Sequence, residues 1–215
     1  MPTFPINIVY QADQWLLIDK PPGLSVHNNE DAQNLLSILN DKLKCKLYAV
    51  HRLDKATSGL MLLAHTPQMT AVLQRALQTA TKTYEAIVRG VPSPHQGVWT
   101  QSISNKSEGR RNPRGKTKLL AQTTYQLLSH NQHLAKIQCT IQTGRQHQIR
   151  KHCVLNRHEI LGDSRYGDPK YQTKMKRRFG DFTMCLQAKS LRFSISTKDF
   201  SFCAPEREDW LPFGV

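Results

Sequence analysis

The clearest pattern along the chain is an alternation of apolar and polar residues in the segment from Leu134 to Gln142. Ala135, Ile137, Cys139 and Ile141 fall on one side of an extended segment, and the residues between them are polar. Because successive side chains of a strand point to opposite faces, this pattern predicts an antiparallel strand with one buried and one wet face.

Further segments also read as strands. The polar turn around Asp13 separates two β-like runs, Ile6–Tyr10 and Trp15–Asp19, which together predict a hairpin. An apolar strand ending near Ala64 is followed along the chain by predicted strands at Lys82–Gly90, Leu119–Leu128, Leu186–Ile195 and Phe200–Cys203. Strands therefore dominate the prediction.

Three helices accompany them. Apolar residues recur at helical spacing over Asp31–Leu43, and a second helix begins near Thr66, which can cap it, with Pro67 at the first helical position. A third helix begins near Arg145, after a glycine turn. Because the strands outnumber the helices and are joined by hairpins, we predict an α+β fold with a mixed, largely antiparallel sheet. No repeat or low-complexity linker interrupts the chain, so we expect a single domain over residues 1–215.

The net positive charge of the chain indicates what kind of partner it binds. The chain carries 30 Lys and Arg against 16 Asp and Glu, a formal charge of +14, which favours a polyanion partner such as nucleic acid over a merely solubilising surface. The cations gather in two segments that we expect to be mobile and to contact phosphates. The first contains Arg110, Arg111, Arg114, Lys116 and Lys118, and the second contains Lys170, Lys174, Lys176, Arg177 and Arg178.

The cysteines and the apolar runs argue against three classes of protein: disulfide-stabilised, cysteine-zinc and membrane-spanning proteins. The five cysteines are odd in number and never form C-x-x-C, which argues against a disulfide framework or a cysteine zinc site. The longest apolar runs, such as Leu60–Ala64, fall far short of the roughly 20 residues of a membrane span. The first residues show no signal peptide, so we expect a cytoplasmic protein without membrane attachment.

A polar cluster stands directly before the strand that ends at Ala64. If residues 51–54 are extended, Arg52 and Asp54 share one face and His51 and Leu53 the other. A turn predicted at Thr57-Ser58-Gly59 would then hold Asp54 on a loop, where catalytic groups often lie. For a lone R-x-D, however, a surface ion pair with an Asx turn is the more common arrangement.

A second polar cluster lies in Q-T-G-R-Q-H-Q-I-R-K-H, residues 142–152. Its charged side chains cannot all pack in a core, so we expect this turn to face an anionic substrate or a buried carboxylate. A metal cluster of His147, His152, Cys153 and His158 lacks the spacing of known sites. Motifs for nucleotide hydrolysis, dinucleotide binding, serine hydrolysis and zincin chemistry are absent from the sequence.

Five segments together resemble the RluA family of RNA pseudouridine synthases. His51–Leu60, H-R-L-D-K-A-T-S-G-L, is similar to the family's H-R-L-D-x-x-T-S-G-[LV] signature without a mismatch. Four more segments match in the family's order: Ile18–His27 with K-P-P-G, Lys82–Gly90 with K-T-Y-E-A, Thr143–Arg150 with T-G-R-Q-H-Q-I-R, and Ile160–Gly167 with I-L-G-D-S-R-Y-G. The resemblance covers almost the whole chain.

The resemblance implies a catalytic domain with a mixed sheet and flanking helices and loops around a central cleft, acting on uridine in ribosomal or transfer RNA. It implies Asp54 as the catalytic aspartate, Arg145 as its ion-pair partner and Tyr84 against the uracil. The substrate-binding residues would be Ile149, packed on the base, Arg52, filling the gap left by a flipped uridine, and His51. It also implies no metal, no organic or nucleotide cofactor, no N-terminal S4 domain, and a monomer.

Two departures and two alternatives remain. Gln187 and Lys151 stand where the family more often has a histidine and a small apolar residue. A non-catalytic RNA-binding protein could keep the same fold, although Asp54 favours the enzyme. A metal-dependent nuclease using Asp54, Asp163 and Asp168 is a third hypothesis, and a chelator would reveal it.

Overall fold

The computed structural model describes residues 6–27, 33–104 and 118–215. The chain forms two compact units. The first comprises Met1–Lys82 and Gln187–Pro205, and the second comprises Thr83–Leu186 and Glu206–Val215. Mixed α+β structure with mainly antiparallel strand pairs confirms the predicted fold class. Within the described residues, no helix is long and apolar enough to cross a membrane.

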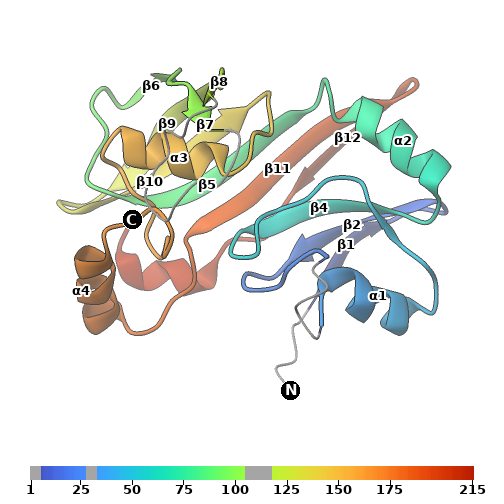
Figure 1. Ribbon diagram of the computed structural model, residues 1–215, viewed down its shortest axis with the longest axis horizontal. Helices are drawn as coiled ribbons and strands as arrows, with labels where there is room; N and C mark the ends of the chain where they lie inside the picture. Colours follow the sequence, from blue (N-terminus) through green and yellow to red (C-terminus); the bar gives the residue numbers. More distant parts are fainter. Residues whose placement is uncertain (1–5, 28–32, 105–117) are drawn as a thin grey trace. The chain divides into compact units, whose positions relative to one another are not determined.

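Strands of the first unit begin with the predicted hairpin, β1 (Asn7–Gln11) and β2 (Trp15–Lys20) (Figure 1). The wholly buried strand β4 (Ser58–Ala64) pairs antiparallel with β2 and parallel with the first residues of β11 (Leu186–Ile195). β12 (Lys198–Cys203) and the short β3 (Tyr48–Ala49) complete the set, pairing with β11 and β4. β4 therefore lies between β2 and β11, and the polar cluster of residues 51–54 comes just before it in the chain.

Two helices flank these strands (Figure 1). α1 (Leu35–Leu43) begins four residues after the predicted start, because Asn34 forms a capping box with Ser37 and so fixes the first turn. α2 (Pro67–Ala76) begins as predicted, with the Thr66 hydroxyl accepting a hydrogen bond from the Met69 backbone N–H.

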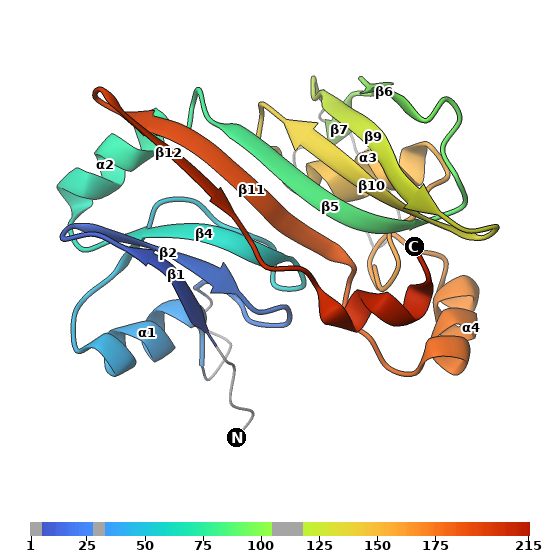
Figure 2. The same ribbon diagram turned by 180° about the vertical axis from the view of Figure 1, so that it is seen from behind.

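In the second unit, β5 (Thr81–Arg89), β10 (Leu134–Ile141), β9 (Thr123–His130) and β6 (Gln96–Trp99) follow one another in the sheet (Figure 2). The alternation that predicted β10 is confirmed, since its four named apolar residues are buried. The predicted strand over 119–128 is wrong in its continuity. Its first residue, Leu119, instead ends the short strand β8 (Lys118–Leu119), which pairs with β7 (Ile103–Ser104).

Three helical segments belong to this unit: α3 (Gln148–Leu155), α4 (Pro169–Phe179) and the 3-10 helix η1 (Glu208–Phe213). The second basic segment, predicted to be mobile, is the regular helix α4. Asp168 caps it, Pro169 occupies its first position, and Gln172 and Met175 bury one face, so the cations lie on the other. The sequence prediction missed both α4 and η1.

Gly59 in β4 is a position where the backbone permits no side chain. Its φ is +108°, and an added Cβ would lie 2.4 Å from the Ala188 carbonyl oxygen. Gly23 provides a matched control, since its φ is +84° but an added Cβ meets nothing within 4 Å.

We predict that Gly59→Ala lowers the free energy of unfolding by about 4 kcal/mol or more, whereas Gly23→Ala costs only the backbone term of about 1–2 kcal/mol. Urea unfolding of both variants measures the difference. Equal losses in the two variants would show that the approach of β11 to Gly59 is not a constraint on the fold.

Candidate functional site

The loop that carries Asp54 ends in a tight turn. The Thr57 backbone N–H donates to the Asp54 carbonyl at 3.0 Å, so the turn spans residues 54–57. The prediction of a turn at 57–59 is wrong, because Ser58 and Gly59 already belong to the buried strand β4. Asp54 itself is half-buried and lies just before a rigid strand.

Lys20 lies beneath this turn with its ammonium group completely buried. Its Nζ donates to three backbone carbonyls, those of Pro21 at 2.9 Å, Leu24 at 2.8 Å and Lys55 at 3.2 Å. Burial lowers the pKa of Lys20 to about 8, and the nearby carboxylates of Asp54 and Asp19 oppose that shift. Lys20 therefore holds the K-P-P-G turn and the Asp54 turn together and places a positive charge near Asp54.

His51 joins the same loop to β4. Its Nε2 accepts a hydrogen bond from the Leu62 backbone N–H at 3.0 Å. Burial, together with the nearby Lys82 ammonium, lowers the pKa of His51 to about 4, so the ring is neutral near pH 7. Arg52 is exposed while Leu53 is buried, which agrees with the opposite faces predicted for this segment.

The remaining predicted catalytic residues belong to the second unit. Tyr84 is half-buried in β5, and Arg145 is exposed in the turn before α3. α3 begins at Gln148 and not at Arg145, because the backbone of His147 is left-handed with φ 55° and ψ 30°. Ile149, in the first turn of α3, is buried.

Gln148 fixes the backbone of the Arg145 turn. Its Oε1 accepts from the Thr143 hydroxyl at 2.8 Å and from the Arg145 N–H at 3.2 Å. Its Nε2 donates to the Gln122 carbonyl at 2.8 Å and to the Thr123 hydroxyl at 3.2 Å. The buried amide thus uses both its donors and two acceptor positions and ties the turn to the start of β9.

Only some of the predicted RNA-binding cations lie within the residues that the structure describes. Arg110, Arg111, Arg114 and Lys116 lie outside the described residues. Lys118 is exposed at the start of β8. The second group is exposed on α4 and includes Lys174, Arg177 and Arg178.

The predicted residues thus divide between the two units. His51, Arg52 and Asp54 share one loop of the first, and Tyr84, Arg145 and Ile149 belong to the second. Lys20 and Gln148 lie within two of the family motifs, but no role was predicted for either residue. A lysine closing the apolar segment W-L-L-I-D-K was a usable signal for the first, because such a charge is costly to bury without partners.

The residues of the metal hypotheses have partners within the protein. Asp163 accepts two hydrogen bonds from the Arg150 guanidinium, and Asp168 caps α4. His152 bonds the Thr123 hydroxyl and the Gln101 carbonyl. Among the described residues, no group of three or more His, Cys, Asp or Glu side chains is arranged to hold a metal ion.

Comparison with known proteins adds independent findings. The family model described as RNA pseudouridylate synthase matches residues 14–154. The chain is 34% identical over 227 residues to the ribosomal large subunit pseudouridine synthase D of Vibrio cholerae, covering 95% of this chain and 68% of that protein. It is 28% identical to the tRNA pseudouridine synthase C of Vibrio parahaemolyticus, covering 87% of this chain and 84% of that one.

Solved structures agree with the sequence matches. The human protein named RNA Pseudouridylate Synthase Domain Containing 4 is 26% identical, with a TM-score of 0.79 over 96% of this chain and 90% of that one. The human protein named RNA Pseudouridylate Synthase Domain Containing 1 is 24% identical, with a TM-score of 0.81 over 96% of this chain and 86% of that one.

We predict that Lys20→Met lowers the free energy of unfolding by about 3 kcal/mol at pH 7, because three backbone carbonyls lose their donor. Between pH 8 and 10, unfolded Lys20, with its ordinary pKa near 10.5, binds more protons than folded Lys20, with a pKa of about 8. The contribution of Lys20 to the free energy of unfolding therefore increases with pH between pH 8 and 10.

Urea unfolding of both proteins at pH 7.5 and 9.5 measures this. The gap between wild type and Lys20→Met should widen at the higher pH. A constant gap would show that Lys20 titrates alike in the folded and unfolded chains.

Proposed function

The chain belongs to the RluA family of RNA pseudouridine synthases, isomerases that act on RNA, and on that premise we propose that it isomerises a uridine in RNA to pseudouridine with Asp54 as the catalytic residue. The observation that carries this proposal is the loop of H-R-L-D, which sets a half-buried carboxylate before a rigid strand and above a buried ammonium. We propose that both units serve one catalytic domain spanning residues 1–215.

The reaction moves the glycosidic bond from one ring atom to another. The N1–C1′ bond breaks, the uracil turns, a C5–C1′ bond forms, C5 loses its proton and N1 gains one. In this proposal the Asp54 carboxylate either attacks C1′ or removes the C2′ proton, and both routes need an ionised carboxylate beside the ribose. The Lys20 ammonium places a positive charge near this carboxylate.

The other residues of the proposal surround the uridine. Arg145 pairs with Asp54, and Tyr84 lies against the uracil, where its phenol serves the proton transfer from C5. Ile149 packs on the base. Arg52, exposed two residues before Asp54, fills the gap left by the flipped nucleotide. His51 contributes by orienting the loop on which Arg52 and Asp54 lie.

The names of the relatives indicate two classes of RNA. One relative is a ribosomal large subunit enzyme and another a tRNA enzyme, so we propose a uridine of ribosomal or transfer RNA as the substrate. We further propose that the protein acts as a monomer without a nucleotide cofactor, in the cytoplasm. Its five cysteines, all free in the structure, are consistent with a reducing compartment.

Tritium release tests the reaction. RNA containing 5-tritiated uridine should release tritium with the wild-type protein, because C5 loses its hydrogen when it bonds to C1′. Asp54→Ala should reduce release by at least 10⁴-fold, as is typical for loss of a group that acts in the chemical step. A chelator should leave wild-type release unchanged.

Each other outcome has a definite meaning. No release from any ribosomal or transfer RNA, despite tight binding, would support the non-catalytic RNA-binding alternative. Cleavage of the RNA that a chelator abolishes would support the nuclease hypothesis. Full activity of Asp54→Ala would remove Asp54 from the reaction.

Salt dependence tests the proposed RNA-binding cations. Replacing Lys174, Arg177 and Arg178 of α4 with Ala should flatten the slope of log affinity against log salt by about 2, since each lost phosphate contact removes about 0.7–0.9. The same should hold for replacing Arg110, Arg111 and Arg114. Filter binding or fluorescence anisotropy at several salt concentrations measures the slope.

Lys42, Lys44 and Lys46 provide the control. They are also exposed, and their triple alanine variant changes the net charge by the same three units. If this control flattens the slope as much as the α4 variant, the effect belongs to net charge alone and α4 is not an RNA contact.

A further inference from the structure

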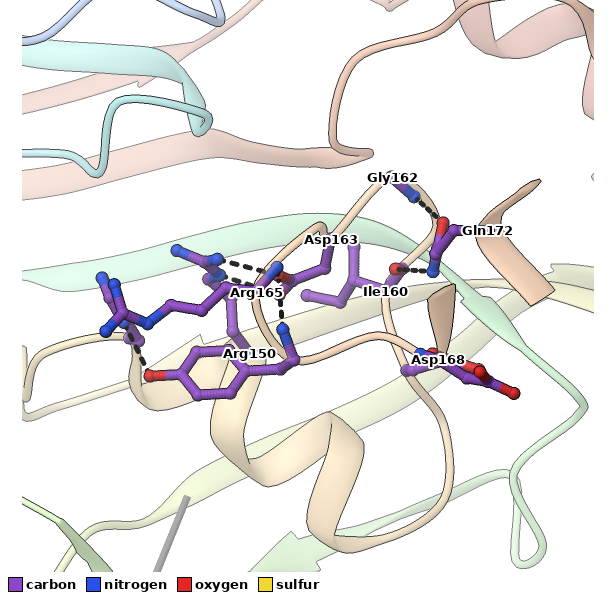
Figure 3. Close-up of polar contacts among 10 residues, drawn as sticks. Arg150, Ile160, Gly162, Asp163, Arg165, Asp168 and Gln172 are labelled. Atoms are coloured by element: carbon purple, nitrogen blue, oxygen red, sulfur yellow. Dashed lines mark hydrogen bonds and ion pairs between the residues drawn. The ribbon is translucent and has the colours of Figure 1, made fainter. Parts of the chain in front are cut away.

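A buried ion pair lies at the centre of a polar network in the second unit (Figure 3). The Arg150 guanidinium donates to both oxygens of Asp163, at 2.8 Å each, and the two residues are 7% and 1% exposed. Asp163 Oδ1 also accepts from the backbone N–H groups of Arg165 and Tyr166, at 2.9 and 3.1 Å. Burial alone would raise the pKa of Asp163, but these bonds lower it, so the carboxylate is ionised.

The network continues from Tyr166 to the start of α3. The phenol oxygen of the buried Tyr166 lies 2.8 Å from Nδ1 of His147, and the two rings meet edge to face. His147 is the residue whose backbone is left-handed, and its side chain makes no capping hydrogen bond to α3. A residue other than glycine adopts this conformation at a cost of about 1–2 kcal/mol, which contacts of its side chain can offset.

The interactions close a ring. Asp163 fixes the backbone of Tyr166, Tyr166 bonds His147, and α3 leads from His147 back to Arg150, which bonds Asp163. Arg145 lies two residues before His147. Its N–H and carbonyl both bond Gln148, the side chain accepting and the backbone N–H donating. The path of the Arg145 turn therefore depends on the left-handed residue that Tyr166 contacts.

We propose that Tyr166 is a positioning residue for catalysis: its phenol holds His147 in the left-handed conformation and so directs Arg145 toward the reacting group. This inference rests on the proposed role of Arg145. In this proposal neither Tyr166 nor His147 contacts the uridine. The pair therefore affects the rate of the chemical step and not the affinity for RNA.

Removing only the phenol oxygen tests the inference. Tyr166→Phe should lower kcat for tritium release about tenfold and leave KM for RNA within about twofold. Tyr171→Phe is the matched control, because within the described residues the buried phenol oxygen of Tyr171 has no hydrogen-bond partner. It should leave both constants unchanged. Both variants should melt within about 8 °C of the wild type, because Tyr166→Phe loses hydrogen bonds to His147 and Arg165 and Tyr171→Phe loses none.

A double-mutant cycle shows whether the two residues act together. His147→Ala should also lower kcat about tenfold, and the double variant with Tyr166→Phe should lose no more than either single variant. Independent action would instead multiply the losses to about a hundredfold. That multiplication would overturn the inference, and so would equal kcat values for Tyr166→Phe and Tyr171→Phe, or a loss that appears only in KM.

Failure of this inference is distinct from failure of the proposed function. If the wild type releases no tritium, the proposed function fails. If the wild type releases tritium, Asp54→Ala does not and Tyr166→Phe equals the wild type, then only the positioning role is wrong.

Discussion

The burial of the Lys20 ammonium beneath the Asp54 turn is the constraint on which the rest of the site depends. An isolated charge would be strongly destabilising in that position. Three carbonyls and two nearby carboxylates make the charge tolerable, and each of them belongs to the local chain around Lys20 or to the Asp54 turn. The contacts that stabilise the ammonium also fix the loop. The same interactions therefore stabilise this region and determine the position of Asp54.

The second unit also contains a buried cation, the Arg150 guanidinium, which is stabilised by different partners. Arg150 has a planar guanidinium that matches the two oxygens of Asp163, whereas the Lys20 ammonium suits three separate carbonyls. In both cases a buried charge organises a segment without regular secondary structure. Replacing such pairs with apolar residues can preserve stability in principle, but it would leave the loops without a defined path.

The regular elements could be predicted because their signals are local. The alternation of β10, the cap and proline of α2 and the length of β11 all follow from neighbouring residues. α4 was missed because its charged residues hid the few buried positions, Gln172 and Met175, and because the capping role of Asp168 was overlooked. The split of β8 from β9 depends on pairing with β7, which local sequence does not reveal.

The site was predictable in its residue types more than in its supports. Three family motifs indicated Asp54, Tyr84 and Arg145, whereas the spacing of Arg52 and Asp54 alone was also compatible with an ordinary surface ion pair. The supporting residues escaped because their roles arise from contacts distant in sequence. Lys20 reaches the Lys55 carbonyl 35 residues away, and Gln148 reaches Gln122 across 26. No period or turn signal encodes such pairings.

The Gln148 side chain has a chemical consequence of its own. Its nitrogen faces a carbonyl that can only accept, and its oxygen faces a backbone donor. Deamidation would exchange that nitrogen for oxygen, add about one mass unit, and set a carboxylate against the Gln122 carbonyl. Ageing at this single amide would therefore loosen the Arg145 turn while leaving the size and composition of the chain almost unchanged.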